Sequence, residues 1–120
     1  MRTLVAILIL ASALTACKKN EAGGKSKISG TVAHHGKLIP YSRVFIKYGA
    51  TEFPGADTTK YDAKFFTGAD ARYSFSLYKG NYYLYGYGYD NGVPGDVAGG
   101  LPYKLRNNED KKLEVPVTEL

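Results

Sequence analysis

The sequence has few of the residues that build disulfides, metal centres and nucleophilic sites. Its 120 residues include one cysteine, two histidines and no tryptophan. A single cysteine cannot form a disulfide within the chain, so no disulfide framework is expected. His34 and His35 are adjacent, and neighbouring residues of an extended chain point to opposite sides. Without further soft ligands they do not indicate a zinc site, and we expect them in a solvent-exposed turn.

Motifs of enzymes are also absent. The chain has no Gly-x-Ser-x-Gly elbow, no phosphate-binding glycine loop and no His-Glu-x-x-His pair. Its carboxylates are scattered, and nothing selects a glycosidase pair. Asp90-Asn91-Gly92 with Asp96 offers oxygen ligands for Ca²⁺, but the spacing differs from that of an EF-hand. We therefore predict no catalytic residues, no metal site and no cofactor. An enzyme of unrecognised type ranks third, after the two binding functions described at the end of this section.

No stretch after Cys17 has a sustained helical period. The chain contains 11 Tyr, 5 Phe and 14 Gly, a mixture of strand-forming and strand-ending residues. Strands are expected at 28–32, 42–48, 60–67, 72–77, 82–89 and 113–117, and the glycine-rich segment 90–104 is expected to be a long loop. Pro116 lacks an N–H, which places the last strand at a sheet edge or bulge. The pattern predicts an all-β fold, a single antiparallel β-sandwich of about seven strands.

The N-terminus has the three parts of a signal peptide. Arg2 precedes an apolar run over 4–14, which is about half of the roughly 20 residues that span a membrane. Leu14, Thr15 and Ala16 then precede Cys17, an arrangement that resembles a bacterial lipobox. The resemblance implies that 1–16 is cleaved and that Cys17 carries lipid, including acyl chains such as palmitate. Two or more chains give stable membrane anchoring. The alternatives are an ordinary secretory signal with a chance cysteine, or a buried N-terminal helix.

Residues 17–27 are predicted to be the lipidated cysteine and a flexible tether. Ten such residues have a root-mean-square reach of roughly 17 Å. Lys18 stands where an inner-membrane retention signal has Asp, so the outer membrane is the expected location in a cell that has one. Cleavage leaves 15 basic and 11 acidic residues, and most of the surplus lies in the tether. The folded part is near neutral, which argues against nucleic-acid binding.

The order of strands and turns resembles the carboxypeptidase regulatory-like domain, which has a transthyretin-like (prealbumin-like) sandwich. The resemblance rests on segments 28–32, 38–46, 70–75 and 79–84. It implies a domain over 28–120 and a non-catalytic accessory role. The related hydroxyisourate hydrolases end in Tyr-Arg-Gly-Ser, which this chain lacks. Ala71 occupies a turn position where the family usually has glycine, so this turn is expected to be rebuilt or strained.

A row of tyrosines is the candidate ligand or partner surface. The resemblance places Tyr82 and Leu84 toward the core, and strand alternation adds Gly86 and Gly88 to the same side. Strand alternation then turns Tyr83, Tyr85, Tyr87 and Tyr89 outward, spaced by about 6.6 Å. Exposed tyrosines can anchor a protein or stack on sugar rings. The alternative is that 90–104, or aromatic residues on neighbouring strands, cover them. The sequence thus predicts a protein-binding or scaffolding module in the cell envelope, and alternatively a carbohydrate-binding module.

Overall fold

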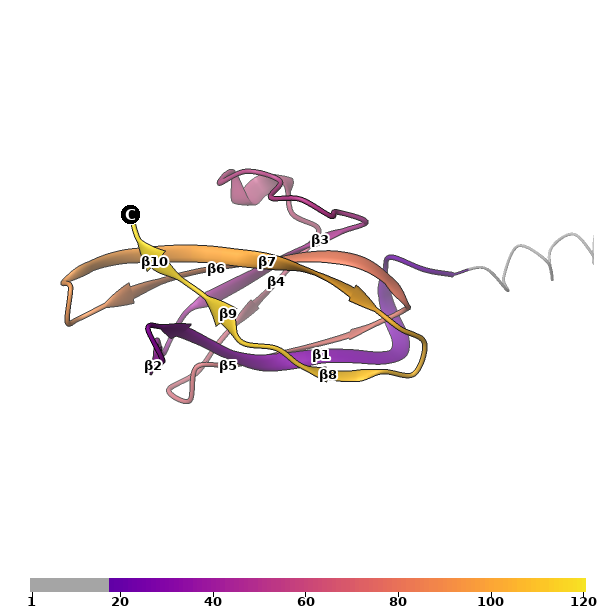
Figure 1. Ribbon diagram of the computed structural model, residues 1–120, viewed down its shortest axis with the longest axis horizontal. Helices are drawn as coiled ribbons and strands as arrows, with labels where there is room; N and C mark the ends of the chain where they lie inside the picture. The colour runs from indigo at the N-terminus through magenta and orange to yellow at the C-terminus, as the bar shows by residue number, and fades with distance from the viewer. Residues whose placement is uncertain (1–17) are drawn as a thin grey trace, which may run out of the picture.

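The computed structural model describes residues 18–120, which form two packed sheets (Figure 1). The elements are β1 (Ala22–His34), β2 (Lys37–Leu38), β3 (Arg43–Tyr48), the 3₁₀ turn η1 (Thr58–Lys60), β4 (Ala63–Phe66), β5 (Arg72–Leu77), β6 (Gly80–Asp90), β7 (Gly95–Leu105), β8 (Asp110–Lys112), β9 (Val115–Pro116) and β10 (Thr118–Glu119). The predicted all-β sandwich is confirmed. It has more strand segments than the seven expected, because four of them contain only two or three residues.

One sheet is built around β1, and the other around the β6–β7 hairpin. In the first sheet β5 and β2 pair with β1 in antiparallel fashion, while β8 and β9 pair with it in parallel. The second sheet has the order β10-β7-β6-β3-β4. Within the described part of the chain, β9 pairs only with β1. Pro116 therefore lies in an edge strand, as its missing N–H predicted.

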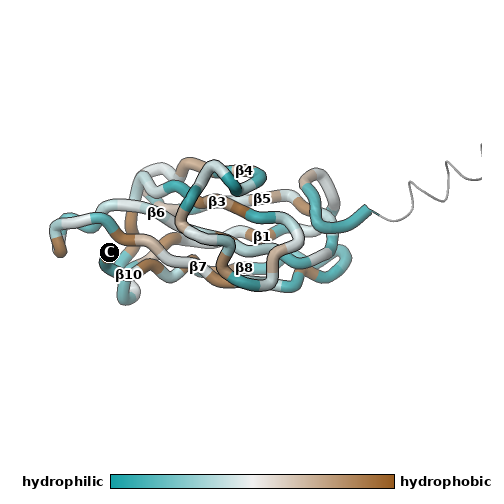
Figure 2. Tube along the Cα trace, turned by 90° about the horizontal axis from the view of Figure 1, so that it is seen from above, coloured by the Kyte–Doolittle hydropathy of each residue, from teal (hydrophilic) through white to brown (hydrophobic). Residues whose placement is uncertain are grey.

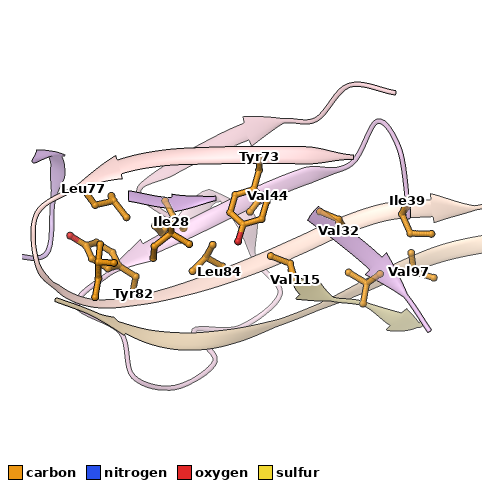
Figure 3. Close-up of a cluster of buried hydrophobic side chains, with 13 residues drawn as sticks. Ile28, Val32, Ile39, Val44, Tyr73, Leu77, Tyr82, Leu84, Val97 and Val115 are labelled. Atoms are coloured by element: carbon orange, nitrogen blue, oxygen red, sulfur yellow. The ribbon is translucent and has the colours of Figure 1, made fainter. Parts of the chain in front are cut away.

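The core lies between the sheets and is formed by alternate residues of the strands (Figure 3). Ile28 and Val32 of β1 face Leu84 of β6, and all three side chains are fully buried. Gly86 continues the inward row of β6 where β9 and the residues after it approach closely. A Cβ atom there would lie 2.9 Å from Cγ1 of Val115. In the second half of β6 glycine alternates with tyrosine, because the core side at Gly86 and Gly88 has no room for a side chain.

The predicted tether is wrong from Ala22 onward, because strand β1 begins there. The two glycines within 22–27 do not act as a flexible linker: Gly23 has a φ of +105°, and Gly24 allows close packing. A Cβ atom on Gly24 would lie 2.4 Å from the carbonyl oxygen of Leu77. The pairing with β5 shifts register between Ala22 and Ser26, and Ser26 is buried. The folded domain thus begins before residue 28.

The predicted loop over 90–104 is also wrong. Residues 95–105 form β7, which pairs with β6 along its whole length, and only 91–94 form the turn. Gly99 and Gly100 are required for close contact. A Cβ atom on Gly99 would lie 2.5 Å from the oxygen of Pro116, and one on Gly100 would lie 2.0 Å from the oxygen of Leu84. Their abundance indicated a loop, but their missing side chains allow sheet packing.

Ala71 confirms the predicted strain at its turn. Its φ is +59°, and the residue is fully buried. Its N–H donates to the oxygen of Gly68 at 3.1 Å, and its own oxygen accepts from the N–H of Val32 at 3.1 Å. These bonds hold alanine in a conformation that costs an L-residue about 1 kcal/mol.

Candidate partner-binding tip

The predicted tyrosine row is divided into a covered half and an open half. Tyr82 and Leu84 are fully buried in the core, so the predicted inward direction is confirmed. On the other face, only 8% of Tyr83 and 5% of Tyr85 is exposed. Tyr87 is half-buried, and Tyr89 is 53% exposed. Only the second half of the row is available to a ligand.

The β3–β4 connection, residues 49–62, lies over the outer face of the second sheet (Figures 1 and 2). Tyr61 stacks on Tyr85 with 5.7 Å between ring centroids and an interplanar angle of 21°. The ring of Phe53 lies 5.7 Å from that of Tyr83 and 5.4 Å from that of Tyr85. Burial raises the pKa of Tyr61 to about 12, and the phenols of Tyr83 and Tyr85 add to this increase.

Neighbouring strands also contribute to this second hydrophobic cluster. Phe45 of β3 and Ala98 of β7 pack against the two buried tyrosines. The hypothesis of aromatic cover from neighbouring strands is thus right in part, but the main cover comes from the connection between β3 and β4, which the sequence pattern did not identify as a cover. Phe53 and Tyr61, on either side of Pro54-Gly55, were the signal for it.

Tyr89, in the open half, lies beside a residue that the sequence analysis did not select. Arg43, the first residue of β3, pairs with Tyr87, and Tyr41 lies in the turn just before β3. Tyr41 and Tyr89 both line a groove of about 240 Å³. Leu38 and Pro40 line the same groove, and Leu38 is 46% exposed. We call Leu38, Pro40, Tyr41 and Tyr89 the distal tip.

Tyr41 combines exposure with backbone strain. Its side chain is 74% exposed, and its φ is +55°, a conformation that a bulky residue rarely adopts. Its N–H donates to the oxygen of Gly68 at 3.0 Å. The buried Ser42 fixes the turn, because its N–H donates to Thr67 Oγ1 at 2.8 Å and its hydroxyl donates to the oxygen of Ile39 at 2.6 Å. The fold therefore holds an aromatic ring in solvent at a cost of roughly 1–2 kcal/mol.

A buried polar cluster supports this end of the sandwich. Lys37 Nζ and the N–H of Gly92 each donate to Asp90 Oδ1 at 2.8 Å. Nδ1 of His34 lies 2.8 Å from Asp90 Oδ2 and donates to it. The bonds from Lys37, His34 and Gly92, in that order, hold the pKa of Asp90 far below its usual range. The cluster joins the β1–β2 hairpin to the end of β6.

The prediction of two solvent-exposed histidines is therefore wrong for His34. Its side chain belongs to β1 and is 6% exposed, whereas His35 is exposed in the turn with a φ of +50°. Nε2 of His34 is closed off from solvent and has no hydrogen-bond partner among residues 18–120. It lies 3.9 Å from Glu119 Oε1. In this conformation the ring has no access to a bound molecule.

The carboxylates considered for Ca²⁺ are not brought together. Asp90 is bound by the polar cluster, while Asp96 accepts a bond of 2.9 Å from the hydroxyl of Tyr87. In the described part of the chain, no three histidine, cysteine or acidic side chains are grouped as metal ligands. None of its helices has the length and apolar character needed to cross a membrane. The predicted lipobox, Leu14 to Cys17, lies outside the described residues.

Comparison with known proteins does not identify a relative. No protein-family model matches the sequence, and no curated protein matches it. The function must therefore be inferred from the tip itself and from the sequence pattern at Cys17.

Proposed function

We propose that this protein is a lipoprotein of the cell envelope, anchored through Cys17, whose β-sandwich binds a protein partner at the distal tip without catalysing a reaction. The anchor is inferred from Leu14, Thr15 and Ala16 before the cysteine. Tyr41 carries the proposal for the tip, because a strained and exposed aromatic residue on a fixed turn is costly unless it has a use.

The composition of the tip favours a protein over a glycan. Leu38 and Pro40 line the groove together with the two tyrosines and add aliphatic surface, and the groove has a volume of only about 240 Å³. Tyrosine is frequent at the centres of protein interfaces, because it offers a large contact area with few rotatable bonds. Carbohydrate binding is the alternative, since Tyr41 and Tyr89 line the same groove as polar Asn91.

Site-specific photo-crosslinking in the native envelope tests the proposal. The full chain carries a photoreactive phenylalanine in place of Tyr89 or, as a control, in place of exposed Thr59 on the covering segment. We expect one discrete protein adduct from position 89 and none from position 59. A Tyr41→Gly substitution in the same chain should remove the adduct without lowering the melting temperature.

Two results would contradict the protein-binding proposal. The first is an absence of adducts at position 89, and the second is an adduct that persists in the Tyr41→Gly chain. A glycan array separates the alternative: glycan binding that Tyr41→Gly removes would make the tip a carbohydrate site.

A further inference from the structure

The end of the sandwich opposite the distal tip is basic. Lys18 and Lys19 lie where the chain enters the fold, Lys79 lies in the β5–β6 turn, and Lys104 and Arg106 lie at the end of β7. Four of these residues line a depression of about 500 Å³, and Lys18 lies near it with Nζ 5.8 Å from the ring centroid of Tyr78. Figure 2 shows hydrophilic residues at this end. We call these five residues the proximal end.

The entering chain is fixed to the proximal end by hydrogen bonds. The N–H of Asn20 donates to the oxygen of Lys79 at 2.9 Å, and its side-chain oxygen accepts from the N–H of Asn81 at 2.8 Å. The oxygen of Glu21 accepts from the N–H of Tyr78 at 2.9 Å. Gly80 permits this contact, because a Cβ atom there would lie 1.9 Å from the Asn20 oxygen.

This attachment shortens the link between Cys17 and the domain. Only three residue steps separate Cys17 from Asn20, and a fully extended chain covers about 10 Å in that number. The sequence pattern had predicted ten flexible residues. With lipid on Cys17, the proximal end cannot move away from the headgroup region of the membrane.

The charge of the proximal end suits an anionic surface. Among the ion pairs formed within residues 18–120, none involves the five basic side chains. Acidic residues lie nearby as well, and one of them, Asp110, is paired with Lys112, its Oδ1 3.6 Å from Nζ. Glu21 is exposed, whereas Glu109 accepts bonds from the Tyr103 hydroxyl and from the N–H of Arg106. Each basic residue close to an anionic membrane strengthens association about fivefold.

We infer that the proximal end docks on the anionic phospholipid headgroups of the membrane that holds the anchor. The inference rests on the proposed lipidation of Cys17. Docking fixes the orientation of the domain, because β6 extends from the proximal end to the distal tip (Figure 1). Its 11 residues span roughly 33 Å, so Tyr41 and Tyr89 are held outward from the membrane.

Fluorescence quenching in vesicles tests the docking. The full lipidated protein is reconstituted into vesicles of phosphatidylcholine alone or of phosphatidylcholine with phosphatidylglycerol, each with a headgroup-linked quencher. One sample carries a fluorophore on Asn107→Cys at the proximal end, and another carries it on Asn91→Cys near the distal tip. We expect stronger quenching at position 107 in the anionic vesicles, and little quenching at position 91 in either.

Charge variants give the matched control. Lys79→Gln/Lys104→Gln/Arg106→Gln should reduce the quenching at position 107 to its value in phosphatidylcholine. Lys47→Gln/Lys60→Gln/Lys64→Gln removes the same number of charges elsewhere and should leave it unchanged. Raising the salt concentration should likewise reduce the quenching at position 107, because salt screens the attraction between the basic side chains and the headgroups. Equal quenching in both lipids, or no effect of the first variant, would overturn the docking.

Failure of the anchor gives a different result. A protein that does not float with phosphatidylcholine vesicles contradicts lipidation at Cys17. The same samples are then sedimented with vesicles. Binding to phosphatidylglycerol that is lost in the Lys79/Lys104/Arg106 variant still supports docking, and no binding overturns it. The crosslink from position 89 is a separate readout of partner binding.

Discussion

The two halves of the outward tyrosine row on β6 have the same local pattern and different environments. Tyr83 and Tyr85 are packed under Phe53 and Tyr61, whereas Tyr89 is open to solvent. All three residues belong to one strand and face the same side. The difference arises from the β3–β4 connection, which covers only the first half. A repeated pattern therefore predicts the direction of a side chain but not its exposure.

Replacing a tyrosine of the covered half should have the largest effect. Tyr85→Ala leaves a cavity under Phe53 and Tyr61, and we expect it to lower the free energy of unfolding by about 3 kcal/mol. Urea denaturation measures this change. Tyr89→Ala is the matched control in the open half and should stay within about 0.5 kcal/mol of wild type. Equal effects at the two positions would show that the cover is not packed.

The core side of the same strand offers a second test. Gly86→Ala places a methyl group 2.9 Å from Val115 Cγ1 and 3.2 Å from Val117 Cγ1. We expect this overpacking to cost about 2 kcal/mol in urea denaturation. Gly68→Ala is the control, because the added Cβ atom would meet nothing closer than Asp70 Oδ1 at 3.7 Å. A neutral Gly86→Ala would contradict the close approach of β9 and the residues after it.

Removing part of the cover should convert the covered half toward the open state. Phe53 is itself 53% exposed, so Phe53→Ala is expected to cost only about 1 kcal/mol of stability. It should nevertheless increase nitration of Tyr83 and Tyr85, as mapped by mass spectrometry. Unchanged nitration would show that Tyr61 alone protects them.

The polar cluster beneath the distal tip predicts acid sensitivity. The folded state lowers the pKa of Asp90, so its stabilising effect is present above the unfolded pKa of about 3.9 and is lost as pH falls through that range toward the folded value. Between about pH 5 and pH 2, the melting temperature should fall less steeply for Asp90→Asn than for wild type. Parallel curves would contradict an ionised Asp90 in the cluster.

The smallest effect is expected to be a gain in stability at the tip. Tyr41→Gly relieves the positive φ, which outweighs the extra freedom of glycine in the unfolded chain, for a net gain of about 0.5 kcal/mol. Thermal unfolding measures it, with Tyr41→Ala as the control that keeps the strain. A loss of stability would show that the ring packs against the tip.

The sequence was most informative where residue alternation carries the structure. It predicted the β-sandwich, the inward direction of Tyr82 and Leu84, the edge position of Pro116 and the strain at Ala71. It was misleading where glycine was interpreted as flexibility. Gly24, Gly99 and Gly100 are placed where another backbone approaches, and a missing side chain looks the same in both roles.

The candidate site was predicted only in part. Tyr89 was selected from its strand, but Tyr41 lies in a turn whose distance from Tyr89 depends on how β3 pairs with β6. The expected solvent exposure of His34 was wrong because its partner, Asp90, is 56 residues away in the sequence, and the local pattern gave no sign of this contact.

The sequence by itself determined the all-β class of the fold and, in the strands it predicted, which way the side chains point, since side-chain direction follows from local geometry with a period of two. Only the tertiary structure decided which outward side chains are covered, which glycines separate backbones and how near the fold begins to Cys17. Those properties depend on contacts between segments distant in the chain, and local residue patterns do not encode such contacts.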